Sequence, residues 1–185
     1  MTPDNTTQLV LALLGFALVA GTLGWSPYGR SIWPPVAAAA LAAASAVAAV
    51  ADEISADRVE MTVLVAISGL LAVAGGGPLT TRIFAVVDHG QPAIDSISDA
   101  GAAGAILKGG AWIGALERMA VFAGLAAGFP EGVAVVLALK GVGRFPDLRG
   151  DAAAGGATTE RFIIGTFTSV LWAAACAGLV ALVRR

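Results

Sequence analysis

Six ionisable residues in the last half of the chain lie inside apolar segments or at their ends. They are Glu117, Arg118, Lys140, Arg144, Glu160 and Arg161. Charge at membrane depth is costly and therefore usually faces protein or water. With two acids and four bases, the group has a positive surplus, which suits an anionic headgroup, a phosphate or a carboxylate. The same residues could instead form ion pairs that only hold helices together.

The spacing of these residues along the chain predicts that they lie at one level. We take residues 111–129 and 132–145 as an antiparallel helical hairpin. Glu117 then lies ~18 Å from the tip and Lys140 ~15 Å, at a rise of 1.5 Å per residue. The other four residues fall at similar heights, and we call the set of six the charged layer. Because neighbours on a helix point about 100° apart, Glu117 and Arg118 should face different partners.

The composition of the chain predicts that a bundle of membrane helices holds the charged layer in place. Of the 185 residues, 57% are hydrophobic and only 13% are charged, whereas soluble domains average about 25% charged residues. A soluble protein of this size has too little interior to hide so much apolar surface. We therefore expect an all-α, polytopic integral membrane protein.

Six apolar runs approach the length of about 20 residues that a spanning helix needs. They cover residues 9–25, 33–51, 61–77, 111–129, 132–145 and 158–183. The second is mostly alanine and would insert weakly alone, so five spans are the alternative to six. The chain is expected to be a single membrane domain over residues 1–185, with three N-terminal spans in 1–77 and a three-helix module in 111–183.

Residues 78–110 are predicted to form the longest polar link. Within it, apolar positions at helical spacing indicate a short helix lying in the membrane interface over about 79–89. An ordinary loop is the alternative interpretation.

The distribution of lysine and arginine predicts the orientation. With six spans, one side carries Arg58, Arg184 and Arg185, and the other carries Arg30, Arg82, Lys108, Arg144, Arg149 and Arg161. The positive-inside rule places the second side in the cytoplasm and both termini outside.

Several classes of site are not indicated by the sequence. The sequence has one cysteine, Cys176, and one histidine, His89. A metal site made of several cysteines or several histidines is therefore not possible within one chain. The sequence contains no recognisable catalytic motif and gives no reason to expect a cofactor. It also contains no basic tract of the kind that binds nucleic acid. We therefore expect neither a catalytic residue nor a metal ligand.

Three motifs occur in order near the C-terminus: Ile113–Arg118 (IGALER), Lys140 with Arg144–Phe145, and Ile163–Ser169 (IIGTFTS) after Glu160. Together they resemble the C-terminal membrane module of an uncharacterised bacterial multi-pass membrane family, over about residues 109–180. The tip Gly128–Glu131 departs from the glutamine-bearing turn of that family. The resemblance implies a bacterial cell (inner) membrane location and supplies no catalytic residue.

Three functions are compatible with these features. The favoured one is a non-enzymatic transporter, carrier or membrane-complex subunit with a cytoplasm-facing charged site. The second is a membrane-embedded enzyme acting on a lipid phosphate, with Glu117 as base and the basic residues as clamps. The third is a structural or regulatory partner whose charges only pin helices. Candidate partners are the lipid bilayer, an anionic lipid or small anion, a second copy of the chain, or another membrane protein.

Overall fold

The computed structural model describes residues 3–51, 54, 56–87, 100–148 and 155–185, and gives the backbone alone for 3–4, 100–109, 144–148 and 155–158. Over these ranges the chain is all-α and forms six helices. They are α1 (Pro3–Leu23), α2 (Trp33–Val50), α3 (Arg58–Val87), α4 (Ala100–Ala126), α5 (Glu131–Leu148) and α6 (Gly155–Val183). The predicted fold class is confirmed at this level.

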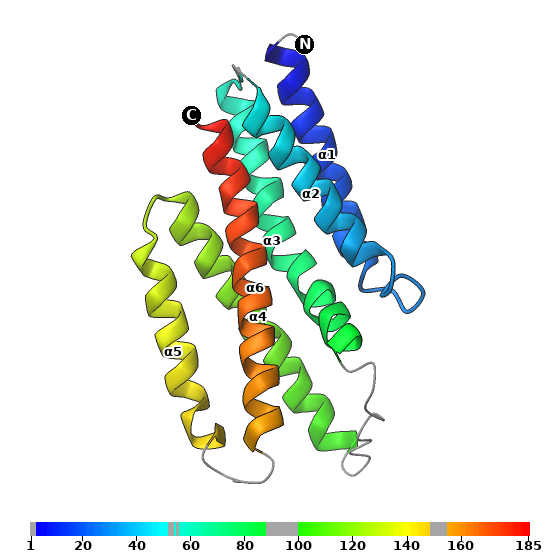
Figure 1. Ribbon diagram of the computed structural model, residues 1–185, viewed down its shortest axis with the longest axis vertical. Coiled ribbons are helices and arrows are strands. Elements are labelled where there is room, and N and C mark those ends of the chain that lie inside the picture. Colours follow the sequence, from blue (N-terminus) through cyan, green and yellow to red (C-terminus); the bar gives the residue numbers. More distant parts are fainter. Residues whose placement is uncertain (1–2, 52–53, 55, 88–99, 149–154) are drawn as a thin grey trace.

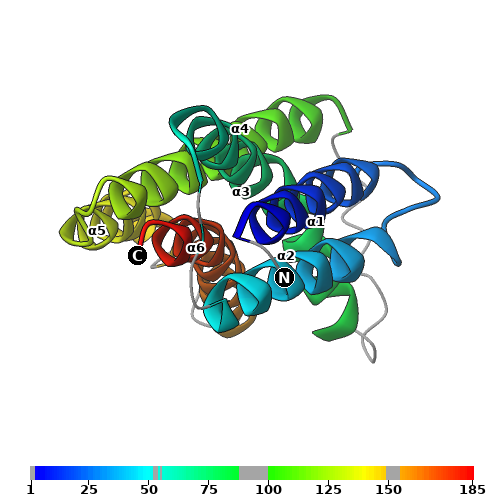
Figure 2. The same ribbon diagram turned by 90° about the horizontal axis from the view of Figure 1, so that it is seen from above.

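The six helices run alternately in opposite directions along the long axis, so both termini lie at one end (Figure 1). Helices α3 and α6 are central. Each contacts four others: α3 packs on α1, α2, α4 and α6, and α6 packs on α2, α3, α4 and α5. Seen from above, α5 lies at the edge of the bundle beside α4 and α6 (Figure 2). The charged-layer side chains of α4 and α5 must therefore reach α3 or α6 to contact the centre of the bundle.

Four helices in the described part of the chain are long and apolar enough to cross a membrane. These segments are Asn5–Leu23, Trp33–Val50, Arg58–Val87 and Thr159–Val183, in α1, α2, α3 and α6. Helix α5 has 18 residues, as α2 does, but four of them are charged. The prediction of membrane-capable helices is thus confirmed for these four.

The alanine-rich α2 packs through its small side chains. Its buried positions recur at helical spacing: Pro34, Ala37, Ala40, Leu41, Ala44 and Ala48. Alanines of α1 are buried as well, including Ala17 and Ala20. Because small residues let membrane helices approach closely, this segment is held by its neighbours although its own hydrophobicity is low.

The helix predicted at about 79–89 is confirmed as helical over its described part, but it is not a separate element, and its interfacial location stays a prediction. Residues 79–87 continue α3 through Pro78, and 88–89 lie outside the described residues. A proline inside a helix leaves the carbonyl four residues earlier without its donor. The indole Nε1 of Trp25 donates to that carbonyl, Ala74 O, at 2.9 Å. The helix therefore continues past Pro78, and its last part turns away from its first part (Figures 1 and 2).

The polar link predicted for 78–110 is also shorter than expected. Helix α3 reaches Val87 and α4 already begins at Ala100, so residues 78–87 and 100–110 are helical, and residues 88–99 lie outside the described part of the chain.

Candidate functional site

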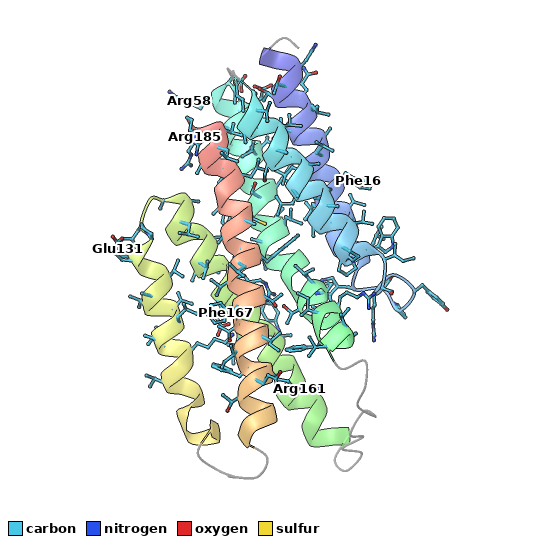
Figure 3. The ribbon with its side chains drawn as sticks, in the orientation of Figure 1. Phe16, Arg58, Glu131, Arg161, Phe167 and Arg185 are labelled. Atoms are coloured by element: carbon cyan, nitrogen blue, oxygen red, sulfur yellow. The ribbon has the colours of Figure 1, made fainter. Side chains whose placement is uncertain are left out.

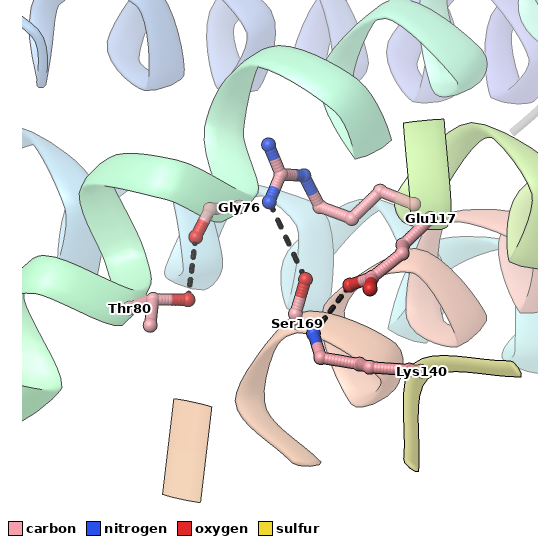
Figure 4. Close-up of polar contacts among 6 residues, drawn as sticks. Gly76, Thr80, Glu117, Lys140 and Ser169 are labelled. Atoms are coloured by element: carbon pink, nitrogen blue, oxygen red, sulfur yellow. Dashed lines mark hydrogen bonds and ion pairs between the residues drawn. The ribbon is translucent and has the colours of Figure 1, made fainter. Parts of the chain in front are cut away.

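Arg118 is the most deeply placed of the described charged residues, with only 6% of its surface exposed. Its Nε donates to the backbone carbonyl of Val73 in α3 at 3.1 Å. Its Nη1 donates to the hydroxyl oxygen of Ser169 in α6 at 3.3 Å (Figure 4). One guanidinium thus joins α4 to both central helices.

Three consecutive glycines of α3, Gly75–Gly77, make room for this contact. Each faces a side chain from a different part of the bundle. A Cβ on Gly75 would lie 2.7 Å from the ring of Trp172, and one on Gly77 would lie 2.8 Å from the ring of Trp25. A Cβ on Gly76 would overlap the side chain of Arg118. We call Gly75–Pro78 the glycine node.

Backbone carbonyls beside the glycine node accept the polar atoms of these same three side chains. Trp172 donates from Nε1 to Leu71 O at 3.0 Å, in addition to the bonds from Arg118 and Trp25. A polar group buried among apolar side chains is destabilising unless it is hydrogen-bonded. The glycines of the node therefore supply the space, and the carbonyls of Leu71 and Val73 just before it supply acceptors for the two buried groups, those of Trp172 and Arg118.

Glu117 faces away from the node, toward α5. Its carboxylate forms an ion pair with the ammonium group of Lys140 (Figure 4). The side chains of Lys140 and Glu117 are 22% and 15% exposed. The Lys140 ammonium also lies 5.8 Å from the centre of the Phe162 ring in α6, within the distance of a cation–π contact. Lys140 thereby connects α5 to both α4 and α6.

Arg118 and Glu117 thus face different helices, as the helical geometry predicts. The remaining members of the layer lie elsewhere. Arg161 is exposed near the start of α6, with its guanidinium 5.7 Å from the ring of Phe84 in α3. Glu160 is exposed. Arg144 is in α5, and its side chain lies outside the described part of the structure.

An open groove of about 560 Å³ lies between α2, α3 and α6. Its lining is almost wholly apolar and includes Leu41, Leu79, Ile83, Leu171 and Trp172. No charged-layer residue lines it. The sequence analysis gave an anion site at the charged layer as one of two interpretations and did not predict this groove.

Among the described residues, no group of histidine, cysteine, aspartate or glutamate side chains could hold a metal ion. Cys176 is completely buried in α6.

The parts of the site that the sequence analysis missed are the glycine node and its tryptophans. The signal was present as three glycines and a proline inside an apolar run, because such a run in a helix indicates close approach of other groups. Ser169 appeared in the sequence analysis only as the end of the third motif, and Arg118 was not identified as its donor.

Comparison with known proteins finds no matching family model, curated protein or solved structure. The family resemblance drawn from the three C-terminal motifs therefore stays a prediction.

Proposed function

We propose that this chain is a six-span protein of the bacterial inner membrane that acts as a non-enzymatic subunit of a membrane complex. In this proposal the charged layer fixes α4 and α5 to the central helices. The observation that carries it is the engagement of Arg118, whose Nε and Nη1 donate to Val73 and Ser169.

The exposed residues of α4 and α5 support six spans. Trp112, Leu116 and Met119 are large, apolar and exposed on α4, and Val135, Leu139 and Val142 are exposed on α5. Soluble monomers seldom expose extended apolar faces of this kind. Contact with lipid would cover both faces and place α4 and α5 in the bilayer beside the four membrane-capable helices.

The contacts within the charged layer support a non-enzymatic role. A general base must reach the proton it removes, whereas the carboxylate of Glu117 is engaged by Lys140. Both Arg118 and Lys140, the deepest candidate phosphate clamps, contact groups of the chain itself. Buried ion pairs and hydrogen bonds of this kind set which helices meet, and with what register.

Labelling of single cysteines tests the number of spans. Tyr28 lies in the turn between α1 and α2, and Glu131 begins α5 at the hairpin tip (Figure 3). We expect an impermeant thiol reagent to label Glu131→Cys in spheroplasts, and Tyr28→Cys only after lysis, both in a Cys176→Ala background. If only the four membrane-capable helices cross, the tip stays in the cytoplasm. Protection of both Glu131→Cys and Tyr28→Cys in intact spheroplasts would therefore exclude six spans, because these two positions lie on opposite sides in any six-span arrangement.

Exchange of the charges tests the role of the layer. In a strain lacking the protein, Glu117→Lys should fail to restore the phenotype of the wild type, and the exchange Glu117→Lys with Lys140→Glu should restore it. A site that binds an anion or moves a proton requires each group at its own position. Loss of activity in a folded exchange variant would therefore overturn the pinning role.

A further inference from the structure

The exposed Arg161 lies on the same face of α6 as the open groove between α2, α3 and α6. On α6, Thr168 and Ala175 line the groove. Arg161 precedes Thr168 by seven residues, and Thr168 precedes Ala175 by seven, so all three share one face of the helix at two-turn intervals of ~10 Å. Arg161 thus lies on the face of α6 that lines the groove, but it precedes the first of the lining residues on that helix.

The last part of α3 brings the two features together. Ile83 lines the groove, and the ring of its neighbour Phe84 lies 5.7 Å from the Arg161 guanidinium. A Cβ on Gly165 of α6 would come within 3.0 Å of the same ring. The segment after Pro78 is therefore packed along α6 between Arg161 and Thr168, and it forms one wall of the groove.

We infer that this groove binds an anionic phospholipid, with an acyl chain between α2, α3 and α6 and its phosphate on Arg161. Almost all of the lining is apolar, and its one α2 hydroxyl, Ser45, donates to Leu41 O of its own helix at 2.9 Å. Such a lining suits hydrocarbon. The volume of about 560 Å³ falls within the range of about 300–1,000 Å³ that is typical of ligand sites.

The positive charge of Arg161 favours an anionic headgroup over a zwitterionic one, because the ammonium group of a choline headgroup cancels the charge of its phosphate. A guanidinium presents paired donors that match two phosphate oxygens. Basic positions between membrane helices on the cytoplasmic side are known to bind anionic headgroups. The ring of Phe84, 5.7 Å from the guanidinium, places this cation beside the last part of α3.

The inference rests on the proposed membrane location but not on the number of spans. It is tested with the full-length chain by native mass spectrometry, which counts phosphatidylglycerol and phosphatidylcholine that stay bound after detergent exchange. Arg161→Gln removes the headgroup contact. Ala42→Phe fills the groove, because Ala42 lines it and is exposed. The matched controls are Arg185→Gln, at the opposite end of α6, and Ala43→Phe, an exposed α2 position that does not line the groove.

We expect Arg161→Gln to weaken phosphatidylglycerol retention roughly ten-fold, the effect of losing one charge-assisted contact, with phosphatidylcholine unchanged. Ala42→Phe should reduce both lipids, whereas Arg161→Lys and the two controls should retain phosphatidylglycerol. Equal phosphatidylglycerol binding by wild type, Arg161→Gln and Ala42→Phe would overturn the inference. Displacement of the lipid by millimolar inorganic phosphate alone would do so as well, because the acyl chain would then contribute nothing. The labelling experiment on Glu131→Cys is independent of either result.

Discussion

Arg118 of α4 occupies the space that a side chain at Gly76 of α3 would need. The guanidinium passes this glycine and reaches Ser169 on the far central helix, at 3.3 Å from its hydroxyl oxygen. The absence of a side chain at one position of α3 thus determines how closely α4 can approach. It also determines whether a buried cation can find its acceptors.

Gly76→Ala should destabilise the protein. The new Cβ would overlap Arg118 and come within 3.0 Å of Trp172, and overpacking of this kind costs about 1–3 kcal/mol. Cys176 is completely buried, so its alkylation by a maleimide on heating reports unfolding. We expect a lower midpoint temperature for Gly76→Ala. Gly178→Ala is the matched control, because a Cβ there meets nothing within 4 Å. Equal midpoints for the two variants would contradict the packing argument.

The distances within the last three helices could be predicted from the sequence because a helix has a fixed rise. Counting residues from the hairpin tip was enough to place Glu117 and Lys140 at the same level, and in the structure the two form an ion pair. The same counting could not choose partners for Arg118. Its acceptors belong to α3 and α6, and no helical rule states which face of a third helix will meet it.

The glycine node and the continuation of α3 could not be predicted for a different reason. Local rules treat Pro78 as a helix end, because the proline removes a donor. That loss is repaired by Trp25, which is 49 residues away in the chain. Only the tertiary arrangement brings the indole to Ala74 O, so an argument from local sequence ends the helix too early.

The Glu117–Lys140 pair should show strong coupling in a double-mutant cycle. Glu117→Gln leaves a partly buried ammonium group without its counter-charge, and Lys140→Met leaves the carboxylate. Each single change should cost about 1–3 kcal/mol. The double variant should cost less than the sum, because no charge is then left unpaired. Cys176 alkylation on heating provides the measurement. Additive effects of the two substitutions would show that the pair does not hold α4 to α5.

The hydrogen bond from Trp25 to Ala74 O should stabilise the protein only while Pro78 is present. Trp25→Phe removes the donor to Ala74 O and should cost about 1 kcal/mol. With Pro78→Ala, a backbone N–H becomes available to the same carbonyl, so Trp25→Phe should then cost much less. Trp112→Phe is the control for loss of an indole, since Trp112 is 72% exposed. An equal effect of Trp25→Phe in both backgrounds would mean that the indole does not replace the missing helical donor.

Substitutions at Arg118 should separate the role of its shape from that of its charge. Ser169→Ala removes one acceptor and should cost about 0.6–1 kcal/mol, as interhelical hydrogen bonds in membranes do. Arg118→Lys keeps the charge but loses the fork whose Nε and Nη1 reach α3 and α6, so we expect a cost of about 3 kcal/mol. Arg118→Met leaves no buried charge and should be less destabilising than Arg118→Lys. The midpoint of Cys176 alkylation ranks the three variants. If Arg118→Lys is as stable as the wild type, charge alone is sufficient at this position, and the geometric link between α4, α3 and α6 is not what stabilises the bundle.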